Sequence, residues 1–353
     1  MYLPEVGFSQ NENRIASTID CRYCAAYGSQ VQKETRVRIG LMIGADKGRY
    51  RQKVAQLVAD AEAAENAGFT SIWMPQVPGD FDAFTAITLM GRATRRIELG
   101  TAVLPIQTRH PIAMAQETLS NQAVCDGRFT LGLGTSHHWI IGDMLGLPYE
   151  RPAHQMRRYL EVLNAALRGP GTVDVENDAY RVHSPIDVTD HAPTPVLLAA
   201  LGPVMLRVAG ELASGTILWM ADERALAGHV VPRITKAAAD AGRPAPRVVV
   251  GVPIAICAND EVDDARAWAN RVLGQAEYSP NYQRMLARGD AASMGNILAA
   301  GDERAVAARL RAFRDAGATD LAVRVLPFGS DRNARIASRD RTLAFAASLC
   351  PTL

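Results

Sequence analysis

Three short segments of the sequence carry residues that could bind a ligand or move a proton. Gly132–Ser136 contains two glycines, which lack a Cβ and let the backbone approach a flat ligand closely. Leu201–Pro203 precedes a predicted helix, whose first backbone N–H groups suit ring oxygens or phosphate. His137 and His138 follow the first segment. An imidazole titrates near neutral pH, so either histidine has the chemistry of an acid or a base.

Each of these segments also has a purely structural interpretation. Two glycines at the end of a strand permit a tight turn. A proline that follows a glycine is typical of the first turn of a helix. A histidine in a loop often has no chemical role. The residue types alone leave both interpretations open.

The sequence predicts no metal site. Adjacent side chains such as His137 and His138 point in different directions, and no matching carboxylate cluster accompanies them. Cys21 and Cys24 have zinc-like spacing, but no second pair of ligands follows at a usable distance. We expect these two to be free thiols. The other three cysteines lie in apolar stretches and are expected in the core: Cys125, Cys257 and Cys350.

Composition excludes several classes of protein. The 353 residues are 48% hydrophobic and 21% charged, which predicts a large core and excludes wholesale disorder. A formal net charge of +1 offers no basic surface for nucleic acid. No apolar run approaches the roughly 20 residues needed to cross a bilayer, and no secretory signal is evident. Five scattered cysteines fit a reducing compartment, so we expect a cytoplasmic protein.

Strands and helices are predicted to alternate along the chain, which is typical of a parallel sheet. Buried strands are indicated by short apolar runs, and helices by apolar residues at helical spacing. The eight predicted strands are Val37–Ile43, Thr70–Met74, Ile97–Val103, Arg128–Leu133, Pro195–Ala200, Thr216–Trp219, Val248–Cys257 and Leu321–Leu326. The clearest predicted helices are Phe81–Thr94, Pro111–Val124, Pro152–Leu167, Val204–Leu212, Glu223–Ala241 and Arg335–Leu349.

We therefore predict a single α/β domain, a closed (β/α)8 TIM barrel over residues 36–353. Residues 1–35 are expected to be a disordered extension. Similar helix-to-strand junctions near both ends of the chain favour a barrel over an open doubly wound sheet. A barrel needs about 250 residues, so insertions are expected at His137–Arg151, Val173–Thr194 and Glu277–Leu298. The second of these has the pattern of a β-hairpin. Ligands of such barrels bind where the strands end.

Six segments of the chain form recognisable motifs: Ala64–Trp73, Arg96–Val103, Arg109–Pro111, Gly127–Gly134, Pro195–Pro203 and Ala213–Ile217. These motifs resemble the bacterial luciferase-like superfamily, and among its branches the chain is most similar to actinobacterial oxidoreductases that use the deazaflavin coenzyme F420. The similarity covers roughly residues 37–330.

This resemblance implies a barrel that holds a deazaflavin, or alternatively FMN, in its mouth. It also implies a non-prolyl cis peptide after the third strand, at Ala102–Val103. Residues expected to contact the cofactor are Gln76, Ala102, Val103, Pro105, Gly134, Thr135, Ser136, Leu201, Gly202 and Pro203. Residues expected to line the substrate pocket are Trp139, Trp219 and Met220, although Trp219 and Trp73 also suit a barrel core.

His137 is the expected catalytic residue, because related deazaflavin dehydrogenases place an acidic or polar residue near this position. Several of them also carry an Asp-His pair after the second strand, where this chain has Gln76-Val77. Valine cannot exchange a proton, and this departure favours reduction of a C=C or C=N bond over alcohol oxidation. The proton would come from His137, from water or from another group.

Further expectations concern charge, assembly and alternative functions. Four basic residues near the mouth could meet the coenzyme's anionic tail: Lys47, Arg49, Arg51 and Arg109. His110 is expected to cap its helix. The protein is expected to bind a small-molecule substrate and to form a homodimer, without nucleic acid or membrane partners. The alternatives are an FMN-dependent monooxygenase and a non-catalytic cofactor-binding barrel.

Overall fold

The computed structural model describes residues 36–353 except 45–51, 189, 191 and 276–278. The predicted extension, Cys21, Cys24 and three of the four basic residues proposed for the coenzyme tail lie outside the described residues. The account below concerns the unit Arg36–Leu353 by itself. None of its described helices is both long enough and apolar enough to cross a membrane.

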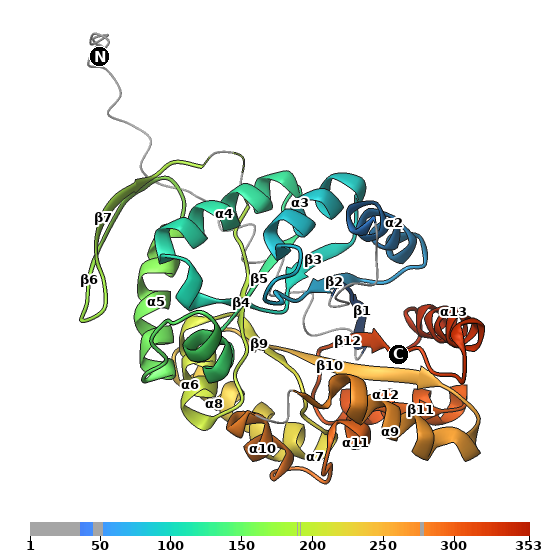
Figure 1. The fold of residues 1–353 in the computed structure, drawn as a ribbon. Helices are drawn as coiled ribbons and strands as arrows, with labels where there is room; N and C mark the ends of the chain where they lie inside the picture. The colour runs from blue at the N-terminus through green and yellow to red at the C-terminus, as the bar shows by residue number, and fades with distance from the viewer. Residues whose placement is uncertain (1–35, 45–51, 189, 191, 276–278) are drawn as a thin grey trace. The chain divides into compact units, whose positions relative to one another are not determined.

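Eight parallel strands close into a barrel, as predicted (Figure 1). The pairing runs from β1 through β2, β3, β5, β8, β9, β10 and β12 and returns to β1. This closure leaves the barrel without an unpaired edge. The strands are β1 Arg38–Met42, β2 Ser71–Met74, β3 Glu98–Thr101, β5 Phe129–Gly134, β8 Val196–Leu198, β9 Gly215–Leu218, β10 Arg247–Ile256 and β12 Asp320–Val325.

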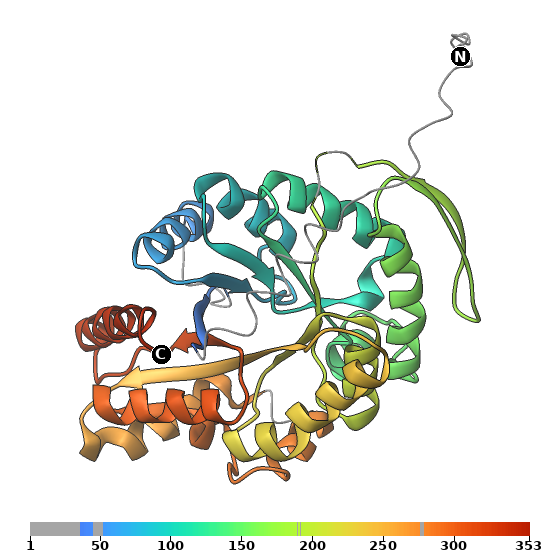
Figure 2. The ribbon, with the colours of Figure 1, turned by 180° about the vertical axis from the view of Figure 1, so that it is seen from behind.

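Helices surround the strands in both views of the ribbon (Figures 1 and 2). They are α2 Lys53–Asn66, α3 Ala83–Ala93, α4 Pro111–Val124, α5 Pro152–Ala166, α6 Pro203–Leu212, α7 Glu223–Ala225, α8 Val231–Asp240, α9 Val262–Leu273, α12 Glu303–Asp315 and α13 Arg332–Leu349. Some boundaries differ from prediction because caps decide them. Helix α13 begins three residues early, where the Asp331 carboxylate accepts from the backbone N–H of Ala334 at 2.9 Å.

All three predicted insertions carry structure of their own. The second forms the predicted hairpin, β6 Gly171–Glu176 paired with β7 Arg181–Ile186, which extends from the ring of helices (Figure 1). The first contains a π-helical turn, η2 Trp139–Met144, which the sequence did not reveal. The third contains α10 Pro280–Leu286 and α11 Met294–Ile297. A short strand after it, β11 Ala299–Gly301, pairs with β10 and was not predicted.

Ion pairs close the end of the barrel where the strands begin. Arg247 lies between Glu98 and Asp320, with N–O distances of 2.8 and 2.9 Å. Arg38 pairs with the same two carboxylates. Burial favours the neutral form of Asp320, but the two guanidinium groups outweigh it and hold the pKa of this carboxyl below its usual range. Paired side chains therefore occupy this end of the barrel.

Above this network, apolar side chains fill the barrel interior. Trp73 is fully buried and packs with Leu197, Ile217, Val249 and Ala322. The guanidinium carbon of Arg247 lies 5.9 Å from the Trp73 ring centroid. The prediction that Trp73 belongs to the barrel core is confirmed. The interior is a packed core, and the mouth at the carboxyl ends of the strands is left for binding.

Replacing Asp320 by Asn should destabilise the fold by ~3–5 kcal/mol, because two guanidinium groups lose the buried charge that pairs them. Urea unfolding followed by circular dichroism measures the change. The lowered pKa also predicts a pH dependence. The wild-type stabilisation is present above the pKa of the unfolded carboxyl and is lost as the pH falls through the folded value.

The control is Asp263→Asn, whose side chain is 95% exposed in its pair with Arg266. This substitution should leave the unfolding free energy unchanged, since exposed pairs contribute little. An Asp320→Asn protein as stable as the control, or as sensitive to acid as the wild type, would show that the network does not hold the barrel together.

Candidate active site

The wall of the mouth is formed where β5 runs parallel to β3 and to the segment that follows β3, in close contact with both. The peptide between Ala102 and Val103 is cis, as the resemblance implied. The predicted strand Ile97–Val103 ends at Thr101, and β4 Leu104–Pro105 resumes pairing, with Pro105 opposite Gly134.

The close approach of the segment after β3 leaves no room for a Cβ at the two glycines of β5. A Cβ on Gly132 would lie 1.9 Å from the carbonyl oxygen of Thr101, and one on Gly134 would lie 2.6 Å from Cγ2 of Val103. The buried Thr101 hydroxyl also donates to the Gly132 carbonyl at 2.9 Å and accepts from its N–H at 2.8 Å. Packing within the protein thus accounts for both glycines, so their presence alone does not indicate a ligand.

The turn after β5 is held from two sides. Ser136 has a left-handed backbone conformation, with φ of 57°. The Tyr149 hydroxyl from the first insertion donates to the Ser136 carbonyl at 3.1 Å and lies 3.4 Å from the Thr135 hydroxyl. Gln107 donates to the Thr135 carbonyl at 3.1 Å. These contacts direct the chain that follows, and with it His137, over the mouth.

His137 lies among side chains from two insertions. Its Nδ1 is hydrogen-bonded to the hydroxyl of Ser279, which precedes α10. Its ring stacks on Trp139 at 5.6 Å between centroids and meets Tyr282 of α10 at 5.7 Å. The neighbouring His138 is exposed. The two adjacent histidines therefore occupy different environments, as expected.

Burial sets the charge of this group. It lowers the pKa of His137, and the neighbouring His138 lowers that pKa further. The imidazole is therefore neutral at pH 7. Burial, together with Tyr149, also raises the pKa of Tyr282 to about 12, so this phenol stays protonated. His137 is the group of this cluster suited to exchange a proton between pH 5 and 8.

The three predicted pocket residues lie in different surroundings. Trp139 is half-buried, and its indole Nε1 is buried with no partner among the described residues. A buried donor without a partner is costly, and a ligand oxygen would satisfy it. Trp219 is half-buried; it packs beside Met220, and its ring also lies against β10, where a Cβ on Gly251 would be 2.5 Å from it. Met220 is fully buried with Met294 and Ile297 of α11, so it exposes no surface to a substrate.

Two predicted contacts have structural partners instead. The Oε1 atom of Gln76 accepts from the N–H of Ala83 at 2.8 Å. A hydrogen bond from Gln76 to a cofactor ring would therefore use its Nε2. Arg109 pairs with Asp82 and with Glu117, each at 2.8 Å. Two carboxylates of the protein thus already balance the charge of Arg109, and its contact with an anionic tail stays a prediction.

His110 caps α4 as predicted. Its Nδ1 accepts from the N–H of Ile112 at 3.2 Å.

The segment Leu201–Pro203 ends at the start of α6. Gly202 is the N-cap residue and provides no side-chain hydrogen bond. A Cβ at Gly202 would meet no atom within 4 Å, and its φ of −82° suits any residue. In contrast to Gly134, nothing in the protein requires a glycine here. The open space and the adjacent helix N-terminus together suit an anionic or polar group of a ligand.

Sequence reasoning missed four residues that shape this site. Tyr149, Ser279 and Tyr282 come from insertions, and no pattern marks them. His229 is buried, with 3% exposure, and its Nε2 lies 2.8 Å from the Leu201 carbonyl oxygen, so it positions the Leu201–Pro203 segment. His229 lies in η3 Leu226–Val230, and no local sequence pattern there predicts its contact with Leu201.

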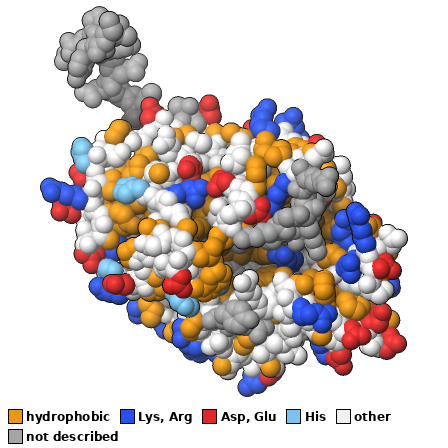
Figure 3. Space-filling model, viewed as in Figure 1, with side chains coloured by type: hydrophobic (Ala, Val, Ile, Leu, Met, Phe, Trp, Pro, Cys, Tyr) orange, Lys and Arg blue, Asp and Glu red, His pale blue; other side chains and the backbone are white. Residues whose placement is uncertain are grey.

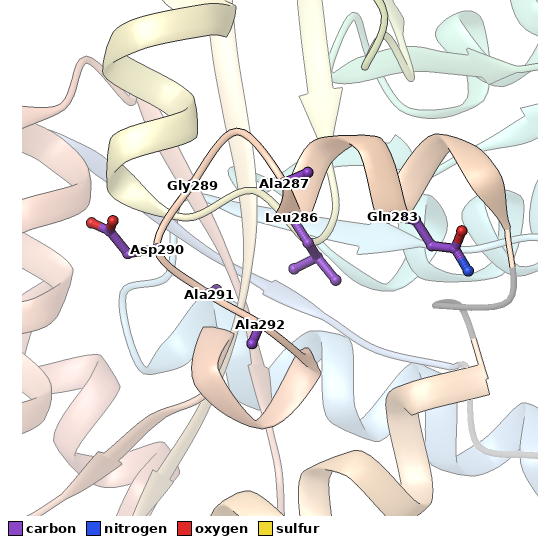
Figure 4. A pocket seen from close by; sticks show the side chains of 7 residues that line it. All are labelled: Gln283, Leu286, Ala287, Gly289, Asp290, Ala291 and Ala292. Carbon is purple, nitrogen blue, oxygen red and sulfur yellow. The ribbon is translucent and has the colours of Figure 1, made fainter.

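Hydrophobic side chains occupy much of the middle of the face seen in Figure 3, and many charged ones lie toward its margin. A separate open hollow of about 460 Å³ lies along the third insertion (Figure 4). Its lining residues are Gln283, Leu286, Ala287, Gly289, Asp290, Ala291 and Ala292. None of the predicted site residues lines it, and Asp290 points away from the other side chains (Figure 4). Among the described residues, no three His, Cys, Asp or Glu side chains form a group able to hold a metal.

With this geometry in place, comparison identifies the family. Residues 35–320 match the family described as luciferase-like monooxygenase, and the chain belongs to it. The fold agrees with a solved F420-dependent tetrahydromethanopterin reductase from Methanopyrus kandleri, with a TM-score of 0.69, 22% identity and coverage of 88% of this chain and 97% of that one. An FMN complex of a Baeyer–Villiger monooxygenase component from Pseudomonas putida is equally similar, with a TM-score of 0.69, 16% identity and coverage of 90% and 98%.

Curated relatives match part of the chain. A Mycobacterium tuberculosis protein, provisionally named a coenzyme F420-dependent oxidoreductase, is 29% identical over 195 residues, which is 52% of this chain and 55% of that protein. A 5,10-methylenetetrahydromethanopterin reductase from Methanolobus tindarius is 26% identical over 165 residues, covering 47% and 50%. The matched region thus spans about half the length of these relatives. The predicted membership of the luciferase-like superfamily is confirmed.

Replacing Gly134 by Ala should lower the free energy of unfolding by ~1–3 kcal/mol, because the added methyl group overlaps the Val103 side chain. Gly202→Asn is the matched control, since Asn is a favourable N-cap residue and the space beside Gly202 is open. Urea unfolding of both variants tests the distinction. Equal stability of the two variants would show that the close contact between position 134 and Val103 does not require glycine.

Proposed function

We propose that this protein is a coenzyme F420-dependent oxidoreductase that reduces a C=C or C=N bond of a small organic substrate. The observation that carries the proposal is His137, a half-buried imidazole just after the carboxyl end of β5 that stacks on Trp139, whose indole N–H has no partner among the described residues. The names of the relatives support the choice of coenzyme, and the replacement of the Asp-His pair by Gln76-Val77 supports reduction.

The residues of the mouth fit such a coenzyme. Gly202 and the first turn of α6 leave space and free N–H groups for a polar or phosphate group. Ala102 and Val103 are half-buried and pack against the apolar barrel interior, where they would support one face of a planar ring. The indole N–H of Trp139 has no protein partner among the described residues. Thr135 and Ser136 would border the ring from the end of β5, and Pro105 and Leu201 would flank it.

When bound, the deazaflavin supplies a hydride from C5 of its ring. The protein orients the reactants and excludes water by means of its apolar floor. In the reducing direction, protonated His137 donates a proton to the substrate atom next to the one that is reduced. Trp139 and Tyr282 fix the plane of its ring, and Trp219 contributes an apolar border.

FMN is the competing cofactor, since solved monooxygenases share the fold. Isothermal titration calorimetry with coenzyme F420 and with FMN separates the two. We expect binding of coenzyme F420 and weaker or absent binding of FMN. Tight binding of FMN alone would favour the monooxygenase alternative. Binding of reduced F420 without oxidation across a panel of enones and imines would favour the non-catalytic one.

Gly202→Asp tests the anion subsite by charge. Asp is a good N-cap residue and leaves α6 stable, but its carboxylate would repel a phosphate at the helix N-terminus. We expect at least ~10-fold weaker binding of coenzyme F420 from this repulsion. The uncharged, nearly isosteric Gly202→Asn should bind more tightly than the Asp variant. Equal affinities of the two variants would place the anionic group elsewhere.

His137→Gln should lower kcat by ~10²-fold, because glutamine forms hydrogen bonds but cannot donate a proton. The lowered pKa of His137 also predicts that wild-type reduction becomes faster as the pH falls from 8 toward that pKa, since the protonated fraction increases. The variant should lose this slope. Steady-state oxidation of reduced F420 between pH 5 and 8 measures both effects, and an unchanged profile would assign the proton to another donor.

A homodimer and a cytoplasmic location remain proposals. Sedimentation velocity of the full chain tests the first.

A further inference from the structure

The group beside His137 comes from a distant part of the chain. Ser279 lies 142 residues away in the sequence, and its side chain belongs to a residue with only 4% exposure. Its hydroxyl contacts Nδ1 of His137, while its own carbonyl accepts from the N–H groups of Tyr282 and Gln283 at 2.9 and 3.2 Å. The hydroxyl therefore does not cap α10 and is directed at the imidazole instead.

The segment that carries Ser279 is tied to the barrel. Met285 of α10 is 1% exposed. After α10, the N–H of Ala291 donates to the carboxylate of Asp222 at 2.8 Å, and Asp222 also accepts from Ala225 at 2.8 Å. A Cβ on Gly289 would lie 2.1 Å from the same carboxylate, so the two segments are in close contact. Asp222 follows β9, so the segment after α10 is anchored to the barrel, and Ser279 lies at the other end of the same short helix.

We infer that Ser279 is a positioning residue that accepts a hydrogen bond from Nδ1–H of His137 and thereby assigns proton exchange to Nε2. The role of Nε2 in proton exchange rests on the proposed function, but the hydrogen bond between Ser279 and His137 does not. A hydroxyl oxygen accepts from Nδ1–H in both the neutral and the protonated ring, and more strongly from the protonated one. Ionisation then occurs at Nε2 and requires no reorientation of the serine.

The surroundings of the ring agree with this assignment. Trp139 stacks on the ring, Tyr282 lies tilted beside it, and His138 is its exposed neighbour in the sequence. None of these residues is described as bonded to Nε2. During reduction, the Nε2–H bond of the imidazolium breaks and its proton joins one atom of the substrate double bond. Hydride from the reduced deazaflavin joins the other atom, so the substrate is reduced, the coenzyme is oxidised and His137 is left neutral with its proton on Nδ1.

The experiment is ¹⁵N NMR of the histidine side chains in the full-length protein without cofactor. The His137 signals are assigned by their loss in His137→Gln, since the chain has seven histidines. Above the pKa, the wild type should show its proton on Nδ1. Ser279→Ala should move that proton at least partly to Nε2 and lower the pKa of His137 further, because the acceptor for the cation is lost. Ser279→Thr retains a hydroxyl and should restore the wild-type pattern.

The matched control is Ser120→Ala on the exposed face of α4, where the hydroxyl bonds only within its own helix. It should change neither signal, and circular dichroism confirms that each variant is folded. A neutral wild-type ring with its proton on Nε2, or identical spectra for Ser279→Ala and wild type, would overturn the inference.

A kinetic measurement separates this inference from the proposed function. With a substrate that the wild type reduces, Ser279→Ala should lower kcat ~10-fold with KM unchanged, and Ser279→Thr should recover most of the loss. A loss confined to KM would contradict the positioning role. Wild-type protein that shows the Nδ1–H signal but neither binds nor oxidises F420 would refute the proposed function while leaving the hydrogen bond established.

Discussion

The close approach of β5 to the neighbouring segment Thr101–Val103 is the constraint on which the mouth depends. Only glycine fits at positions 132 and 134, because the Thr101 carbonyl and the Val103 side chain occupy the space of a Cβ. The Thr101 hydroxyl then bonds both backbone groups of Gly132. This contact holds the ends of two neighbouring strands at a fixed separation. His137 follows β5 by three residues, so the close contact of β5 with its neighbour also helps to position the candidate acid.

The two ends of the barrel have different roles. At the amino ends of the strands, Arg38, Glu98, Arg247 and Asp320 form a paired network, and Trp73 packs above it. Buried charges arranged in this way are stable only when all are paired, which makes this end rigid and closed. At the carboxyl ends, aromatic side chains from insertions surround the candidate acid His137. Because the two ends are built from different segments, the loops at the mouth can change in sequence without loss of the barrel.

Insertions, not barrel strands, supply the chemistry of the proposed site. Tyr149 comes from the first insertion and Tyr282 from the third, and both lie near His137 or the turn before it. Burial of the imidazole lowers its pKa and favours the neutral ring. The environment that would exclude water in the proposed reaction therefore also makes the protonated ring scarce. The pH optimum of the proposed reaction would therefore depend on the balance between exclusion of water and the fraction of His137 that is protonated.

The sequence by itself determined the barrel, because periodicity and alternation of strands and helices are local patterns that any reader of the chain can count. It also indicated the hairpin and the cap formed by His110, and family motifs pointed to the cis peptide at Ala102–Val103. Only the tertiary structure decided the partners of the candidate residues. It assigned Gly134 to packing against Val103, paired Arg109 with two carboxylates and buried Met220. It also brought Ser279 to His137 across 142 residues, since a contact between two insertions depends on how the closed barrel brings its loops together.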